Sequence, residues 1–160
     1  MTKEIIITRG RVAVVDDEDY DYLVSLGSWY SHSEKDEYAV KGRDPQIFMH
    51  KVIMQSICGP LQPGFTIDHI DTDKLNNRRH NLRIATLSQQ AMNRPKSINC
   101  SSKYKGVTWD KGICKWRAMT RVNKKLIHLG SFSEEIRAAK AYNDAAVKYF
   151  GEFACLNVIE

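Results

Sequence analysis

The chain has 160 residues, enough for one ordinary domain or two small ones, and its 42% hydrophobic and 27% charged residues are typical of a protein that folds. These values exclude a disordered or fibrous chain, and no window reaches the roughly 18 apolar residues that a membrane span needs. We therefore expect a cytoplasmic protein without a cleaved leader.

Positive charge is concentrated toward the C-terminus. The net charge is +5, of which residues 1–60 carry −3, residues 61–100 carry +3 and residues 101–160 carry +5. Within 101–132, eight basic residues accompany the single acid Asp110. Such a cluster is expected of a surface that binds phosphates, and a solvated basic face would give the same pattern. The four cysteines form no C-x-x-C pair, so we interpret them as reduced thiols.

The first sixty residues predict short strands and two helices. Strand-like runs occur at 4–8, 10–16 and 29–43. Residues 18–26 have apolar side chains at helical spacing, and Gly27 is placed to end that helix. A second short helix is expected within 46–58, ended by Gly59 and Pro60.

The middle of the chain predicts a strand, a long loop, a strand and a helix. The expected order is a strand at 66–70, a polar loop at 71–81 and a strand at 82–86. Thr86 and Gln89 have the spacing of a capping box, in which each side chain bonds the other residue's backbone. They should open a short helix that continues through Asn93.

The last third predicts three strands followed by one long helix. The strands are expected at 103–110, 115–122 and 125–132. Ser133 is the expected N-cap of the helix, with Glu134 and Glu135 in its first turn and Gly151 at its end. An apolar stripe should pack this helix on the strands through Ala138, Ala141, Tyr142, Ala145 and Tyr149.

Asp68 and His69 are adjacent residue types that can divide the work of phosphodiester hydrolysis. A carboxylate can hold a divalent cation, and a neutral histidine can take a proton from water. Neighbouring side chains on a strand point to opposite faces, so the pair works together only if the strand ends there. The long loop that follows makes such an end plausible.

Ordered motifs around this pair resemble the HNH endonuclease family, in particular its phage and intron-associated branch. D-H-I-D, L-N-N-R, H-N-L-R and T-x-S-Q follow one another within residues 47–94. The resemblance implies a ββα-metal module with Asp68 as metal ligand and His69 as general base. It also implies that Asn81 pins the loop and helps to orient His69.

The third position of the family motif, a His or Asn metal ligand, falls on Gln90 here, and Asn93 is the alternative ligand one turn further on. The resemblance implies one divalent ion, Mg²⁺ with Mn²⁺ as an alternative. Two further histidines stand outside the motif. We interpret His50 as structural and expect His80 to contact phosphate.

A second set of motifs resembles the DNA-binding domain of the plant ethylene-response-factor (Apetala) family. Y-K-G-V, K-W-R-A, H-L-G-S-F, A-A-x-A-Y and L-N occur in order over residues 103–158. The resemblance implies a three-stranded antiparallel sheet that enters the DNA major groove, with a helix packed behind it. The DNA contacts that it implies are Lys105, Trp109, Lys115, Trp116, Arg117, Arg121, Lys124, Lys125 and His128.

At two positions the sequence differs from that family in a way that should weaken the recognition of DNA bases. Thr108 and Lys105 stand where the family has arginines, and lysine lacks the bidentate fork that reads guanine. The sheet is therefore expected to grip phosphates more than it reads sequence. For Trp116, packing between the sheet and the helix is an equal alternative to DNA contact.

We therefore predict an α+β protein of two modules. Residues 1–96 hold the nuclease core, 97–102 form a linker and 103–158 form the DNA-binding domain. The expected function is a metal-dependent homing-type endonuclease that nicks or cleaves double-stranded DNA, a monomer in the bacterial host of a phage or prophage. The alternatives are a DNA-binding regulator with an inactive HNH scaffold and a packaging accessory that binds nucleic acid without sequence choice.

Overall fold

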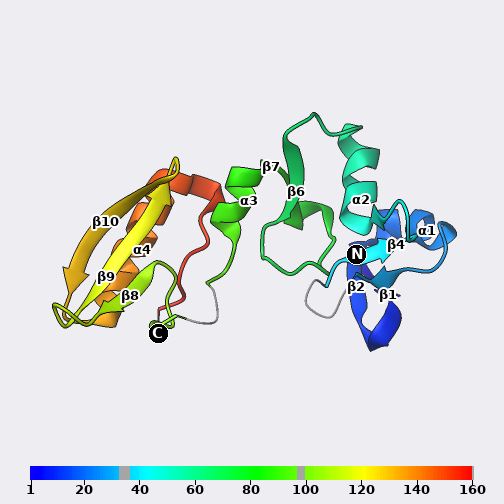
Figure 1. The fold of residues 1–160 in the computed structure, drawn as a ribbon. Helices are drawn as coiled ribbons and strands as arrows, with labels where there is room; N and C mark the ends of the chain where they lie inside the picture. The colour runs from blue at the N-terminus through cyan, green and yellow to red at the C-terminus, as the bar shows by residue number, and fades with distance from the viewer. Residues whose placement is uncertain (33–36, 97–99, 160) are drawn as a thin grey trace. The chain divides into compact units, whose positions relative to one another are not determined.

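A computed structural model describes residues 1–32, 37–96 and 100–159 (Figure 1). The chain divides into two compact units, Met1–Gln90 and Ala91–Glu160. The first three residues of the predicted 97–102 linker lie outside the described residues. Each unit has its own sheets and apolar core, and together they form the α+β fold that the sequence predicts.

The first unit begins with an antiparallel hairpin of β1 (Thr2–Ile6) and β2 (Val12–Asp16). Helix α1 (Asp17–Ser25) follows directly and packs on both strands, and its end agrees with the stop expected at Gly27. A small second sheet consists of β3 (Tyr30–Ser31), β4 (Ala39–Lys41) and β5 (Ile47–Phe48). Helix α2 (Met49–Cys58) then ends at Gly59, as the sequence predicts.

The middle of the chain has the predicted order of strand, loop, strand and helix, and the division between the two units falls within that helix. This middle part contains β6 (Phe65–His69), a 3-10 turn (Arg79–Asn81), β7 (Leu82–Thr86) and α3 (Leu87–Asn93). The capping box is confirmed: the Thr86 N–H donates to Gln89 Oε1 at 2.8 Å, and the Gln89 N–H donates to Thr86 Oγ1 at 3.2 Å. It fixes where β7 turns into α3.

One apolar core joins the N-terminal residues to β6 and β7. Its fully buried side chains include Val15 of β2, Leu23 of α1, Ile53 of α2 and Ile67 of β6. Trp29 is buried beside them and donates from Nε1 to the Leu23 carbonyl at 2.9 Å. The acidic N-terminal residues therefore form part of the same folded unit as Asp68 and His69.

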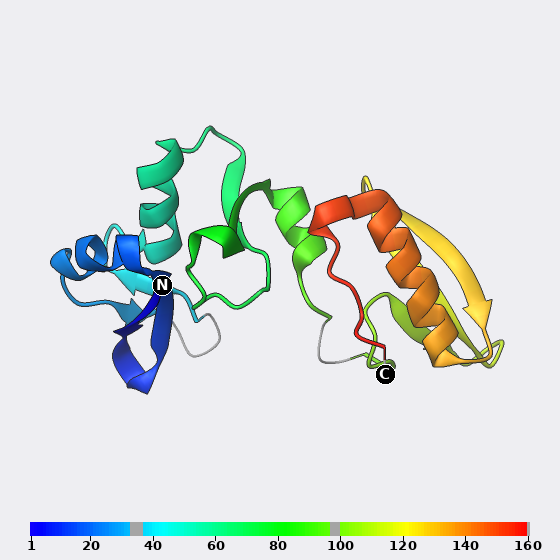
Figure 2. The ribbon, with the colours of Figure 1, turned by 180° about the vertical axis from the view of Figure 1, so that it is seen from behind.

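The second unit contains an antiparallel sheet in the order β10-β9-β8, with bounds β8 (Val107–Asp110), β9 (Lys115–Val122) and β10 (Lys125–Phe132). Helix α4 (Glu135–Phe150) packs along one face of this sheet, as Figure 1 and the reverse view of Figure 2 both show. Among the described residues of this unit, no helix covers the opposite face of the sheet.

Two details of α4 differ from the sequence prediction. Its N-cap residue is Glu134, not Ser133, and no side chain caps the helix. Glu135 instead turns its carboxylate toward the segment before β8, where it accepts from Ser102 Oγ at 2.6 Å and from the Lys103 N–H at 3.2 Å. Tyr149 was expected in the apolar stripe but is exposed, and Phe150 is the buried aromatic residue there.

None of the helices in the described part of the chain combines the length and the apolar character needed to cross a membrane. The longest of them, α4, carries charged residues along its exposed side.

Candidate functional site

Asp68 and His69 are the last two residues of β6, and both are buried. Across the hairpin Asp68 pairs with Arg83, and His69 pairs with Leu82. Arg83 donates from Nε and Nη2 to Asp68 Oδ2, at 3.0 and 2.8 Å. His69 is the last residue of the strand, and both residues still pair with β7.

The His69 ring is held from one side by Asn77, a residue that the sequence analysis did not single out. His69 Nε2 lies 3.3 Å from Asn77 Oδ1, and Asn77 is fully buried. Burial lowers the pKa of His69 below its ordinary value, and the Asn77 hydrogen bond and nearby carboxylates oppose that shift. The ring is therefore neutral at neutral pH, the state that a general base requires.

His50 and Tyr38 form the other walls around the same ring. The His50 and His69 ring centroids are 5.1 Å apart and nearly perpendicular, and the Tyr38 ring lies 5.9 Å from His69. His50 is buried, and among the described residues its Nδ1 finds no hydrogen-bond partner. Burial lowers the pKa of His50 to about 3. The residue interpreted as structural thus lies beside the candidate base.

Asn81 holds the loop between β6 and β7. Its Oδ1 accepts from the Asp71 N–H at 3.0 Å, and its Nδ2 donates to Asp71 Oδ1 and to the Asn76 carbonyl, both at 2.8 Å. Its own backbone carbonyl accepts from the Ile70 N–H at 2.9 Å. Asn81 therefore anchors the loop, whereas Asn77 contacts the His69 ring.

Acidic residues at the start of α1 clamp the loop from outside. Asp19 accepts two hydrogen bonds from the Arg79 guanidinium, at 2.8 and 2.7 Å, and Glu18 forms an ion pair with the same side chain at 2.8 Å. Asp16 Oδ2 accepts from the Arg79 backbone N–H at 2.7 Å. These contacts give a structural role to three of the acidic residues in the N-terminal part of the chain. His80, the expected phosphate contact, is exposed on the same 3-10 turn.

Gln90 reaches β6 next to Asp68. Its Nε2 donates to the Ile67 carbonyl at 3.3 Å, and the described residues offer its Oε1 no donor. The alternative ligand, Asn93, is buried in the second unit, beyond the division after Gln90. No cluster of three His, Cys, Asp or Glu side chains suited to a metal occurs among the described residues. Gln90 therefore contacts β6 at the residue before Asp68.

The face of the β8, β9 and β10 sheet that is opposite α4, called the open face below, carries some of the predicted DNA contacts. Paired residues of antiparallel strands lie on the same face. Ala118 and Val107 pair beneath α4, so Trp116 and its partner Trp109 share the helix side of the sheet. The intervening positions belong to the open face, which therefore carries Lys115, Arg117, Arg121 and, opposite Met119, His128.

The other predicted DNA contacts lie elsewhere. Trp116 packs against the core beneath α4, in agreement with the packing alternative, and the Trp109 ring meets it edge-on at 5.0 Å. Lys125 pairs with Val122 and shares the helix side, and Lys124 lies in the turn between β9 and β10. On the open face, Arg117 forms an ion pair with Asp110 at 3.0 Å.

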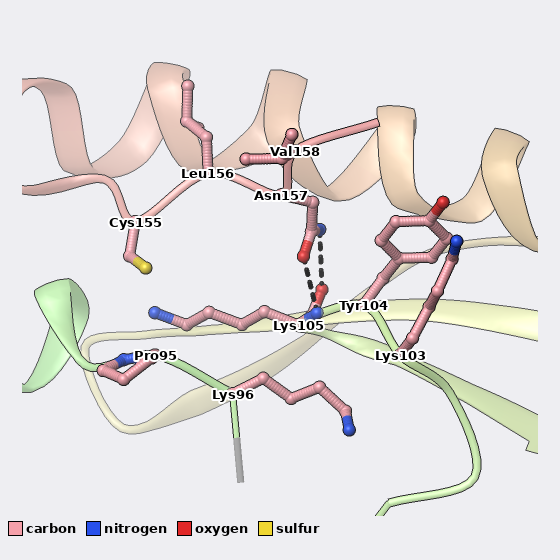
Figure 3. A pocket seen from close by; sticks show the side chains of 9 residues that line it. All are labelled: Pro95, Lys96, Lys103, Tyr104, Lys105, Cys155, Leu156, Asn157 and Val158. Atoms are coloured by element: carbon pink, nitrogen blue, oxygen red, sulfur yellow. Dashed lines mark hydrogen bonds between the residues drawn. The ribbon is translucent and has the colours of Figure 1, made fainter. Parts of the chain in front are cut away.

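Lys105 precedes β8 and is engaged with the protein. Its Nζ donates to the carbonyls of Met92 and Arg94, both at 2.6 Å, and burial lowers its pKa. Its backbone is held by Asn157, whose amide accepts from the Lys105 N–H and donates to the Lys105 carbonyl (Figure 3). A pocket of about 400 Å³ opens beside it. This geometry favours a structural role for Lys105.

Comparisons with known proteins define the class of the first unit. A family model described as HNH endonuclease matches residues 48–92, which include Asp68, His69 and Asn81. An uncharacterized HNH endonuclease of Acanthamoeba polyphaga mimivirus is 32% identical over 144 residues, covering 86% of this chain and 71% of that protein. The chain belongs to the HNH endonuclease family, and this membership makes it a nuclease.

Further relatives connect the chain to a phage and to plants. Protein 3.8 of Escherichia phage T7 is 32% identical over 76 residues, which is 48% of this chain and 63% of that protein. APETALA2-like protein 2 of Oryza sativa is 43% identical over 58 residues, which is 36% of this chain and 13% of that protein. No solved structure matches the chain.

Proposed function

We propose that the chain is a metal-dependent endonuclease that nicks or cleaves double-stranded DNA. The observation that carries this proposal is the placement of the buried His69 directly after Asp68 at the end of β6. The arrangement provides a proton acceptor beside a carboxylate within the segment that the HNH family model matches.

In this proposal His69 takes the proton of the attacking water. The water oxygen forms a bond to phosphorus, the bond from phosphorus to the leaving oxygen breaks, and the proton passes to the imidazole. Asp68 and Gln90 would hold one divalent ion, Mg²⁺ or alternatively Mn²⁺, because oxygen donors suit hard cations. When bound, the ion supplies charge stabilisation at the scissile phosphate.

We propose that the open face of the second unit anchors the DNA. Lys115, Arg117, Arg121 and His128 lie on that face, and Asp110 partly neutralises Arg117. Because two of the predicted contacts, Trp109 and Trp116, share the helix side, phosphate attraction should dominate over base reading there. The likeness to Apetala-type plant proteins supports DNA as the ligand.

We further propose a homing-type role for a monomer encoded by a phage or prophage and acting in the bacterial host cytoplasm. The mimivirus and T7 relatives support this viral setting. One alternative remains, a DNA-binding regulator that retains the HNH fold. The specific observation in its favour is Gln90, which stands where the family has a His or Asn ligand.

A plasmid assay tests the proposed activity. Supercoiled DNA is incubated with the full chain in Mg²⁺, in Mn²⁺ and with excess EDTA, and topoisomers are separated on a gel. The proposal predicts open-circular or linear product with either metal and none with EDTA. DNA binding without product in both metals would overturn the enzyme and favour the regulator. Absence of product in both metals, together with binding that falls steeply with salt and ignores sequence, would indicate an accessory protein.

A further inference from the structure

Two aromatic side chains near the candidate base lie outside the apolar core of the first unit. The Tyr38 ring is 5.9 Å from the His69 ring and meets the Phe48 ring edge-on at 5.7 Å. Tyr38 and Phe48 are both partly exposed. In the described structure their chain neighbours Ala39 and Met49 belong to the core, whereas the two rings do not. Packing in the core therefore does not explain why aromatic rings stand at these two positions.

A lysine lies over each of these rings. Lys74 Nζ is 4.7 Å from the centroid of Tyr38, and Lys51 Nζ is 5.1 Å from the centroid of Phe48. An ammonium group is attracted to the face of an aromatic ring within about 6 Å. The exposed His32 ring also stacks on Phe48, with 27° between the planes and centroids 5.9 Å apart. This part of the surface therefore combines flat rings with positive charges.

The acidic side chains of the loop that carries Lys74 are engaged within that loop. Asp71 Oδ1 accepts from the Asp73 N–H at 2.9 Å, and Asp71 Oδ2 accepts from Asn76 Nδ2 at 2.5 Å. Asp73 Oδ1 accepts from the Leu75 N–H at 2.9 Å. Donors of the loop therefore compensate these two carboxylates, and the loop repels a phosphate less than two uncompensated charges would.

Rings combined with lysines suit an unpaired base of a nucleic acid. In a duplex the neighbouring bases cover both faces of each base, so a protein ring can stack only on a base that has left the helix. We propose that Tyr38 and Phe48 form a stacking platform for an unpaired DNA base next to the nuclease site. The base takes the place of an ammonium group over one ring. The flexible stems of Lys51 and Lys74 then let their charges reach the adjoining phosphates.

The platform defines which form of DNA the nuclease site prefers. Tyr38 contacts both Phe48 and His69, so a base that is held on the platform lies next to the candidate base. The preferred substrate is then duplex DNA that has a mismatch, a bulge or a short gap near the cleaved bond. This preference in cleavage rests on the proposed nuclease function, whereas binding of an unpaired base to the platform does not.

Photo-crosslinking of the full chain tests the platform without any cleavage. The probe is a DNA duplex with a short single-stranded gap that contains iododeoxyuridine, a base analogue that crosslinks to aromatic side chains stacked on it when irradiated. EDTA is present throughout. After digestion with trypsin, mass spectrometry should find the crosslinked nucleotide on peptides 36–41 and 44–51, which contain Tyr38 and Phe48. Crosslinks confined to the second unit would overturn the platform.

Substitutions of two phenylalanines separate stacking from folding. Phe48→Leu keeps an apolar side chain and removes the ring. It should weaken binding of the gapped duplex about tenfold and leave binding of an intact duplex unchanged, as measured by fluorescence anisotropy in EDTA. Phe48→Tyr keeps a ring that can stack and should retain the natural affinity. Phe65→Leu is the matched control, because Phe65 is an exposed phenylalanine of the same unit, and it should change neither affinity.

The outcomes distinguish the platform from the proposed function. An equal loss of affinity for gapped and intact duplex in Phe48→Leu, or the same loss in Phe65→Leu, would overturn the platform. If Phe48→Leu does not fold, crosslinking of the natural chain still decides. Crosslinks at Tyr38 and Phe48 in a chain that cuts no DNA would support the platform and refute the nuclease function. Cleavage of DNA by a chain that gives no such crosslinks would refute the platform alone.

Discussion

Arg83 donates two hydrogen bonds to one carboxylate oxygen of Asp68, from Nε at 3.0 Å and from Nη2 at 2.8 Å. The two side chains are only 11% and 7% exposed. A buried carboxylate needs such compensation, because removing a charge from water costs several kcal/mol. Arg83 therefore supplies this compensation for the Asp68 carboxylate at the end of β6.

Replacement of Arg83 by methionine should destabilise the first unit by about 3–5 kcal/mol, because it leaves a buried charge without its partner. The measurement is urea unfolding followed by the fluorescence of buried Trp29. Arg43→Met, at an exposed arginine, is the control and should change the free energy by less than about 0.5 kcal/mol. A loss below about 1 kcal/mol for Arg83→Met would contradict this account.

His50 should make the protein sensitive to acid. The unfolded chain protonates this histidine below its ordinary pKa of 6.5, whereas burial lowers the pKa in the fold to about 3. Stability should therefore fall as pH decreases from 6.5 toward 3, since the unfolded state binds the extra proton. Burial lowers the pKa of His69 as well, so His69 also lowers the stability of the fold as the pH decreases. His69 is present in both the natural chain and a His50 variant.

His50→Phe keeps an aromatic ring and removes the buried nitrogen that has no partner in the described structure. Its unfolding free energy should exceed that of the natural chain at pH 5 by more than it does at pH 7.5. His80 is exposed, so His80→Gln serves as the control. It should leave the difference in unfolding free energy between pH 5 and pH 7.5 as it is in the natural chain. Parallel pH curves for His50→Phe and the natural chain would show that His50 does not carry this sensitivity.

Basic residues on the open face of β9 should set the salt dependence of DNA binding. Arg121→Ala should weaken binding to all sequences similarly and reduce the slope of log K against log salt by about 1. Lys140→Ala on the exposed side of α4 is the matched control and should change neither quantity. Fluorescence anisotropy with a labelled duplex measures both. An equal effect of the two substitutions would mean that the open face is not the anchor.

Gln90→Asn restores the residue type that the HNH family uses at this position. The shorter side chain has one fewer rotatable bond to order, so half-maximal plasmid cleavage should occur at a lower Mg²⁺ concentration. If Gln90 is the ligand, Asn93→Ala should not shift that concentration. If Asn93→Ala raises the Mg²⁺ requirement and Gln90→Asn does not alter it, the ligand assignment must move to Asn93.

Elements with local signals could be predicted from the sequence. The capping box of Thr86 and Gln89, the end of α2 at Gly59 and the three strands of the second unit depend on neighbouring residues, and the structure confirms them. The first of these strands is shorter than the predicted 103–110, because it begins at Val107. Helix α4 is confirmed as an element, but its first turn differs because Glu135 bonds a distant segment. Helix propensity depends on residues that are near in sequence, so it could not predict this contact.

The contacts of the site depend on residues that are far apart in the sequence. Asn77 donates a hydrogen bond to the Val14 carbonyl, and Arg79 donates hydrogen bonds to Asp16 and Asp19. No motif near Asp68 predicts these contacts. The face of the sheet on which Trp116 lies could have been predicted from the sequence. It is two residues before Ala118, an apolar position suited to the face beneath the helix, and strand side chains alternate.

The rate of plasmid cleavage by the natural chain and by His69→Ala, in saturating Mg²⁺ and with DNA binding measured in parallel, tests the central claim most directly. Loss of a general base should slow cleavage about 10²–10⁴-fold while DNA binding stays intact. Equal cleavage by both chains, or DNA binding with no cleavage by either, would contradict the assignment of His69 as the base of an active nuclease.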